Sequence, residues 1–103
     1  EYLIAEIEKA VLDSLYLPKY AGGYQRIENC IVEGWQELDT EKLVEYAVKM
    51  DNNSLISRLG FLIERNGLEM SKNLMKDLLD HRSRTYVPIY SEEEKNERWR
   101  VKY

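Results

Sequence analysis

Apolar residues recur at helical spacing through most of the chain and divide it into five predicted helices. The first ends at Pro18, and the Tyr- and Gly-rich stretch that follows, with Gly22-Gly23, predicts a loop. The second spans about residues 24–38, with Cys30 expected on its buried side. The apolar stripes of these two helices are Ile7, Val11, Leu12 and Leu15, then Ile27, Ile31, Trp35 and Leu38.

Polar residues that favour helix ends separate the next three helices. Asp39 is the expected N-cap of the third, the run 51–54 ends it and caps the fourth, and the fifth begins near Ser71. Asn66-Gly67 predicts the end of the fourth helix, and Gly60 within it offers a place for a neighbouring backbone to approach closely. Their stripes are Leu43, Val44, Ala47 and Met50; Leu55, Ile56, Leu59, Leu62 and Ile63; and Leu74, Met75, Leu78 and Leu79.

From Thr85 onward the apolar period changes from helical spacing to two, which predicts a β-hairpin with a long loop. Pro88 lacks an amide proton, so the strand 85–90 is expected to lie at a sheet edge or to be bulged. A lone hairpin is only marginally stable, and the segment 1–4 is the expected third, extended partner. The predicted fold is α+β and mainly α, with about five helices packed with a small antiparallel sheet formed by the N-terminal segment and the C-terminal hairpin.

Length and composition indicate a single domain over residues 1–103. No apolar run approaches the ~18–20 residues that a membrane span needs, so no membrane association is expected. One cysteine and one histidine leave no disulfide or zinc motif, which favours a cytoplasmic protein without a metal or cofactor. The chain opens on Glu1 without a Met, and we therefore expect a partial protein.

The net charge of −4 is unevenly distributed. Residues 81–103 hold six Lys and Arg against four acids, a net +2, so residues 1–80 carry −6. A strand over residues 98–103 would place Arg98, Arg100 and Lys102 on one face, with Arg82 and Arg84 nearby in sequence. These five cations have two interpretations. They form either a basic surface that contacts nucleic-acid phosphates or an acidic partner, or a solvated outer sheet face without a partner.

Three tyrosines surround the Gly22-Gly23 turn, namely Tyr16, Tyr20 and Tyr24. They predict either a stacking or protein-contact surface or the packing of the loop onto the helices. Glu6, Glu8 and Asp13 are interpreted as a solvated helix face, with Lys9 at ion-pair spacing from Asp13. No nucleophile–base pair, metal cluster or phosphate loop is evident, so the chain is not expected to be an enzyme.

Four stretches along the chain carry a family resemblance. They are Glu8-Lys-Ala-Val-Leu-Asp13 running on to Gly23, the Arg-Leu-Gly segment 57–64, Thr85-Tyr-Val-Pro-Ile89, and Asn96-Glu-Arg-Trp-Arg-Val101. In this order they resemble the C-terminal domain of AbiEi-type antitoxins, which belong to abortive-infection toxin–antitoxin systems of phage defence and are often described as transcriptional regulators.

The resemblance implies a non-catalytic regulatory domain that helps to neutralise a nucleotidyltransferase-like toxin, directly or indirectly, and supports autoregulation by the full-length protein. Promoter DNA would be bound by an N-terminal winged-helix domain expected upstream of Glu1, and little by residues 1–103 alone. The alternative is a helical protein-interaction or oligomerisation module unrelated to toxin–antitoxin systems. A nucleotidyltransferase-type gene directly downstream would favour the antitoxin hypothesis.

Overall fold

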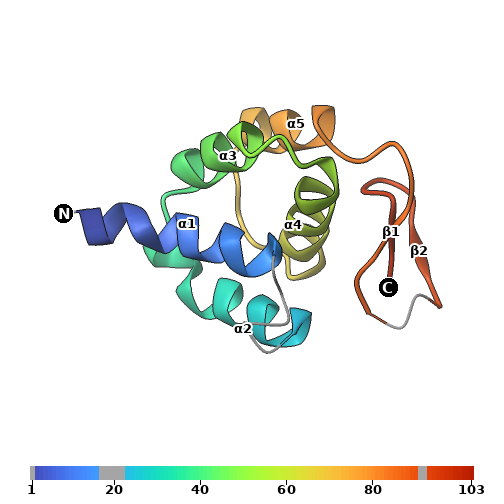
Figure 1. The fold of residues 1–103 in the computed structure, drawn as a ribbon, viewed down its shortest axis with the longest axis horizontal. Coiled ribbons are helices and arrows are strands. Elements are labelled where there is room, and N and C mark those ends of the chain that lie inside the picture. The colour runs from blue at the N-terminus through green and yellow to red at the C-terminus, as the bar shows by residue number, and fades with distance from the viewer. Residues whose placement is uncertain (1, 17–22, 91–92) are drawn as a thin grey trace.

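The computed structural model describes residues 2–16, 23–90 and 93–103, with side chains from residue 8 onward in these ranges. Five helices come first and three short strands last, as Figure 1 shows. The elements are α1 (Tyr2–Tyr16), α2 (Tyr24–Gly34), a 3-10 turn η2 (Trp35–Glu37), α3 (Thr40–Lys49), α4 (Asn53–Arg65), α5 (Lys72–Asp80), β1 (Val87–Pro88), β2 (Lys95–Asn96) and β3 (Val101–Lys102). The predicted number of helices is confirmed. None of the helices in the described ranges is long and apolar enough to cross a membrane.

Side-chain caps begin three of the helices where the sequence predicts them. Asp39, Asn52 and Ser71 accept hydrogen bonds from the backbone amides three residues later. At the end of α4, Gly67 adopts a φ of +64°, and the Leu68 amide donates to the Ile63 carbonyl at 3.1 Å. This pattern satisfies the last carbonyls of the helix and turns the chain toward α5.

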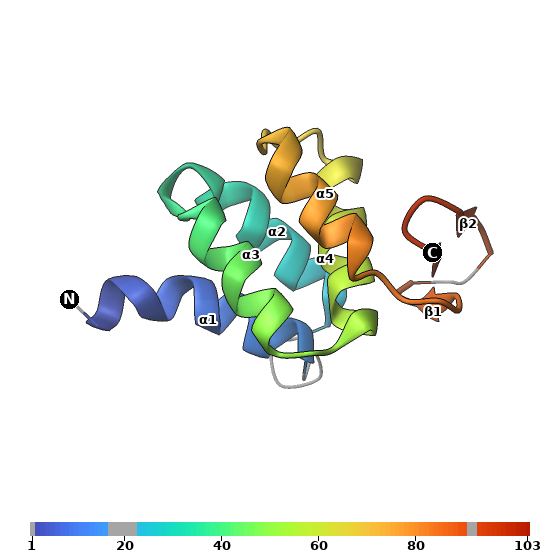
Figure 2. The same cartoon turned by 90° about the horizontal axis from the view of Figure 1, so that it is seen from above.

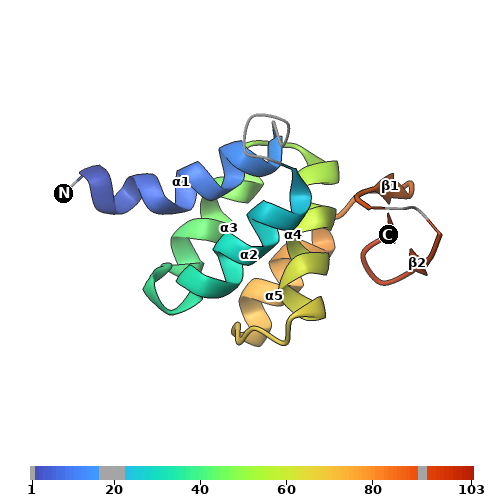
Figure 3. The ribbon, with the colours of Figure 1, turned by 90° about the horizontal axis from the view of Figure 1, so that it is seen from below.

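Helix α4 forms the centre of the fold. It has eight buried residues between Leu55 and Ile63 and packs against α1, α3 and α5 on one side and β1 and β3 on the other. Figure 2 and Figure 3, from above and below, show the strands set to one side of the helices, next to α4. A helix that is apolar around most of its circumference is stable only when surrounded in this way.

The sheet differs from the prediction in both composition and direction. It is mixed, with strand order β1-β3-β2, and is built from C-terminal residues alone. β1 runs parallel to β3, and β2 runs antiparallel to it. The predicted antiparallel hairpin between 85–90 and 98–103 is therefore wrong, although β1 does lie at the edge that Pro88 requires.

The N-terminal segment does not join the sheet, because α1 begins at Tyr2. The spacing of Ile4, Ile7 and Val11 continues the helical period, and no Pro or Gly interrupts it. The prediction of an extended segment 1–4 was therefore wrong.

Two side chains on α1 and α2 lie in the opposite environment to the one expected. Glu8 was interpreted as solvated, yet it is 2% exposed and its Oε2 accepts from the Asp39 amide at 2.9 Å. It shares one stripe with Leu12 and Leu15, at i+4 and i+7. Cys30 is exposed, because α2 buries Ile27, Glu28 and Ile31 and leaves position 30 on its flank.

Candidate functional site

Helix α4 holds the C-terminal segment through polar side chains in its Arg-Leu-Gly stretch. Ser57 Oγ accepts from the Ser83 amide at 2.7 Å, and Arg58 Nε donates to the Pro88 carbonyl at 2.9 Å. Pro88 has no amide hydrogen to donate, and its carbonyl oxygen already accepts the hydrogen bond from Arg58. Both backbone groups of Pro88 are therefore unable to pair with another strand in the usual way. This outer edge of β1 is closed to further strand pairing at Pro88.

Trp99 is the largest side chain between α4 and the sheet. It is fully buried, and its six-membered ring lies where a Cβ at Gly60 would be. Its indole Nε1 donates to Glu64 Oε1 at 2.6 Å, and Glu64 Oε2 pairs with Arg98 Nε at 2.7 Å. The close approach expected at Gly60 is therefore made by a side chain rather than a backbone.

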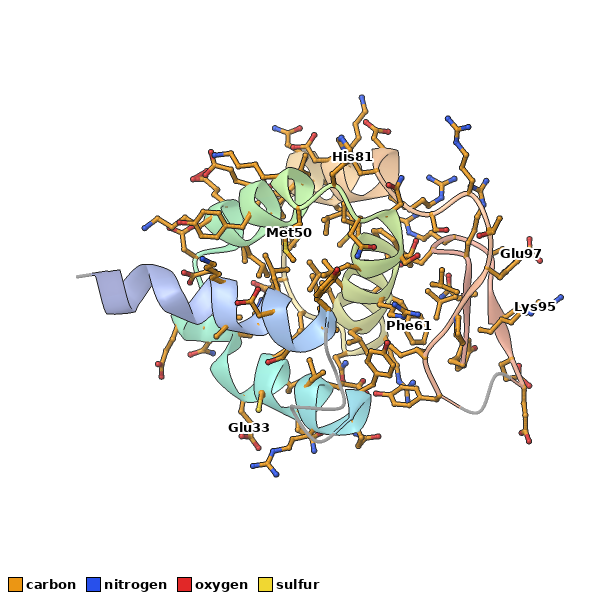
Figure 4. All side chains as sticks on the ribbon, in the orientation of Figure 1. Glu33, Met50, Phe61, His81, Lys95 and Glu97 are labelled. Carbon is orange, nitrogen blue, oxygen red and sulfur yellow. The ribbon has the colours of Figure 1, made fainter. Side chains whose placement is uncertain are left out.

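The sheet has an apolar inner face and a cationic outer face. Val87 and Val101 pair in register and are buried against α4. At the next register position, Lys102 of β3 pairs with Pro88 of β1 and with Lys95 of β2, and these three residues share the opposite face. Tyr86 precedes Val87 in the chain and belongs to the same face by alternation. Lys95 Nζ lies 5.3 Å from the Tyr86 ring centroid, and Figure 4 shows Lys95 directed away from the helices. We call Tyr86, Pro88, Lys95 and Lys102 the outer face.

The three cations predicted on one strand face do not share one. Residues 97–100 form turns, because the Asn96 side chain accepts from the Trp99 amide at 2.9 Å and Arg100 adopts a φ of +56°. Arg98 pairs with Glu64 on α4, and half-buried Arg100 donates from Nη1 to the Ser83 carbonyl at 3.1 Å. Only Lys102 belongs to a strand.

Arg82 and Arg84 flank the residue that Arg100 binds. Arg82 Nη1 donates to the Leu79 carbonyl at 2.7 Å, while its Nε is buried without a partner among the described residues. Arg84 is exposed. The structure thus places Arg100 against Ser83, the residue between Arg82 and Arg84 in the sequence, and Lys102 with Lys95 on the outer face.

Lys95 and Tyr86 were not predicted as members of a cationic face. Tyr86 could have been found from its alternation with buried Val87. Lys95 follows three consecutive glutamates, and this local acidity gave no sign that it pairs in register with Lys102.

The three tyrosines of the predicted loop cluster have different positions. Tyr16 is 56% exposed, and Tyr20 lies outside the described residues. Tyr24 is half-buried. Its ring centroid lies 5.3 Å from the guanidinium carbon of Arg58 and 6.5 Å from the ring centroid of Tyr90, and the two rings form a T-shaped pair. Tyr24, the first residue of α2, thus packs against α4 and the segment before β2, while the loop residues 17–22 lie outside the described part of the chain.

Tyr90 is tied to a buried carboxylate that was not among the predicted site residues. Its hydroxyl donates to Glu28 Oε1, and Glu28 Oε2 accepts from Asn66 Nδ2 at 2.7 Å. Arg65 lies 3.4 Å from the same carboxylate and over the Tyr90 ring. Burial raises the pKa of Tyr90, as do its hydrogen bond to Glu28 and the charge of that carboxylate, while Arg65 partly opposes the shift.

The described residues contain no group of three or more His, Cys, Asp or Glu side chains placed to hold a metal ion. Two open grooves border α5. One, of about 720 Å³, lies between α3 and α5, and the other, of about 820 Å³, lies beside the connection 67–71. No family model, curated protein or solved structure matches this chain.

Proposed function

We propose that this chain is the non-catalytic regulatory domain of an AbiEi-like antitoxin. In this hypothesis the domain contributes to the neutralisation of a nucleotidyltransferase-type toxin and to autoregulation in the cytoplasm, without a cofactor. Promoter DNA is bound by a winged-helix domain of the intact protein, and the small sheet of the present chain carries a further contact surface.

One observation carries the proposal: three of the four stretches that resemble the antitoxin domain meet in space. The segment 57–64 supplies Arg58, which binds Pro88 of the stretch 85–89. It also supplies Glu64, which binds Trp99 of the stretch 96–101. Stretches far apart in sequence thus support one packing arrangement, which is what a shared domain fold requires.

The outer face is the surface that this arrangement offers to a partner. Lys95 is exposed and Lys102 is half-buried, and both belong to a sheet whose opposite side is buried. Cations gathered on one accessible face attract phosphates or an acidic protein surface.

The experiment is a charge reversal in the intact antitoxin, co-expressed with its toxin. Lys95→Glu with Lys102→Glu is expected to weaken operator binding, flatten its salt dependence, and leave the melting temperature nearly unchanged. The matched control is Lys9→Glu with Lys76→Glu, which makes the same charge change at exposed positions on α1 and α5. Equal operator affinity and toxin protection in parent, outer-face variant and control would contradict the proposal.

A helical interaction module unrelated to toxin–antitoxin systems is the second candidate, and the open grooves beside α5 favour it. The neighbouring reading frame separates the two. A nucleotidyltransferase-type gene directly downstream supports the antitoxin proposal, and a neighbour of another class supports the module.

A further inference from the structure

Helix α5 leaves most of its apolar side chains only partly covered. Only Leu78 among its four apolar residues is fully buried, and Leu74, Met75 and Leu79 are half-buried. Helix α4, by contrast, is buried around most of its circumference. These half-buried side chains pack against the core and leave part of their apolar surface accessible.

One of these side chains, Leu74, lines a groove between α3 and α5. The two helices lie side by side, as Figure 2 shows, and the groove has a volume of about 720 Å³. Its apolar lining is formed by Val44, Val48 and Leu74. Val44 is buried, whereas Val48 and Leu74 keep part of their surface accessible, so the groove offers apolar area to an added side chain.

The charges around the groove are predominantly negative. Four carboxylates line it, against two lysines. Lys49 is already paired with Glu45 at 3.7 Å, while Glu41 and Asp77 stand on facing helices. A surplus of two negative charges opposes nucleic acid and anionic lipid and attracts cations.

We propose that this groove, which we call the acidic groove, binds an amphipathic helix of a partner protein whose apolar stripe is flanked by Lys or Arg. The apolar lining would receive the stripe, and Glu41, Glu45 and Asp77 would face the cations. Helices α3 and α5 are about 15 and 14 Å long at 1.5 Å per residue, which matches two to three turns of a bound helix. The acidic groove and its partner are independent of the outer face, so this proposal does not rest on the proposed function.

The test uses synthetic helical peptides and residues 1–103. A peptide of about 12 residues, with Leu at i, i+3, i+4 and i+7 and Lys elsewhere, is titrated by calorimetry. The same peptide with Glu in place of Lys is the comparison. The Lys peptide is expected to bind and to shift amide resonances of α3 and α5, and the Glu peptide is expected not to bind.

Three variants locate the site. Glu41→Lys with Asp77→Lys is expected to weaken binding of the Lys peptide at least about tenfold, or 1.4 kcal/mol. Val48→Ser is expected to weaken it without changing the charge. The remote control is Glu33→Lys with Glu97→Lys, which makes the same charge change at exposed positions on α2 and in the turn after β2, as Figure 4 shows. It is expected to keep the affinity within about twofold, because salt screens charges that lie far from the groove.

Circular dichroism melts establish that each variant is folded before titration. The proposal is overturned if the Lys peptide fails to bind the folded parent, or if the Glu peptide binds equally well. It is also overturned if the remote control loses as much affinity as the groove variant, because the attraction would then follow net charge alone.

Discussion

The indole ring of Trp99 occupies the space that a side chain at position 60 would take. A Cβ built on Gly60 would come closer to three ring carbons of Trp99 than real Cβ contacts allow. Because both partners are buried, neither can move aside into solvent. The glycine in α4 is therefore a packing requirement of the sheet.

Replacing Gly60 with Ala is expected to destabilise the protein. Overpacking costs about 1–3 kcal/mol, and the gain in helix propensity, at most ~1 kcal/mol, offsets only part of it. Urea unfolding measures the change. Gly34→Ala is the matched control, because nothing lies within 4 Å of its Cβ position, and it is expected to be neutral or stabilising. Equal stability of Gly60→Ala and the parent would show that Trp99 does not occupy this position.

Replacing Glu64 with Leu is expected to cost about 1–3 kcal/mol, because it leaves the buried indole N–H of Trp99 without its acceptor. Glu64→Gln retains an acceptor and is expected to cost less. Arg98→Ala removes only the more exposed ion pair and is expected to cost below about 1 kcal/mol. Chemical unfolding ranks the three, and a larger loss in Arg98→Ala than in Glu64→Leu would contradict the assignment.

Alkaline pH is expected to lower the stability through Tyr90. Its pKa is raised in the folded state, so the unfolded chain releases the hydroxyl proton at about pH 10, while the folded protein still holds it. The stabilisation from protonated Tyr90 is complete below pH 10 and decreases as the pH rises above it. Tyr90→Phe is expected to reduce this decrease, measured as unfolding free energy from pH 8 to 11. Parallel pH profiles for parent and variant would contradict the prediction.

Removing residues 97–103 is expected to cost several kcal/mol. The deletion removes Trp99 and Val101, which are fully buried, and each buried apolar side chain contributes ~1.5–3 kcal/mol. Since a domain has about 5–15 kcal/mol of stability in total, a large fall in melting temperature is expected. Coincident thermal melts of the truncated and intact chains would show that the helices fold without the sheet.

Duplex DNA is expected to bind residues 1–103 only weakly and without sequence preference, with a Kd of about 10⁻⁴ M or higher at physiological salt. The net charge is −4, and exposed Glu93, Glu94 and Glu97 lie near Lys95 in the sequence. A gel-shift assay measures the affinity. Sub-micromolar, sequence-selective binding would contradict the prediction.

Local signals in the sequence were sufficient to predict the helices. The caps at Asp39, Asn52 and Ser71 and the turn at Gly67 act within a few residues, so they can be recognised without the fold. The prediction that Cys30 is buried was wrong, because Cys30 lies beside the apolar stripe of α2 and only the neighbouring helices determine which side of that stripe is covered.

The sheet and the contact surface could not be predicted in the same way, because they depend on contacts between residues far apart in the sequence. The bond between Ser83 and Ser57 and the bond between Trp99 and Glu64 join residues 26 and 35 positions apart, and no periodicity encodes them. The alternation from Arg98 to Tyr103 predicted a strand. In the structure, the Asn96 side chain accepts a hydrogen bond from the Trp99 amide, the backbone forms a turn there, and Trp99 is buried in the core. Arg98 therefore pairs with Glu64 and Arg100 binds the Ser83 carbonyl, so the two arginines do not form a row of cations on one strand face.

The strand order β1-β3-β2 also constrains how synthesis and folding are coupled. β3 is the last of the three strands to leave the ribosome, yet it lies at the centre of the sheet and bonds to both others. β1 and β2 do not pair with each other, so neither has a sheet partner until residue 102 has emerged. The helices can assemble during translation, whereas the sheet side of α4 stays exposed until then, and a chaperone that covers this side would act in that interval.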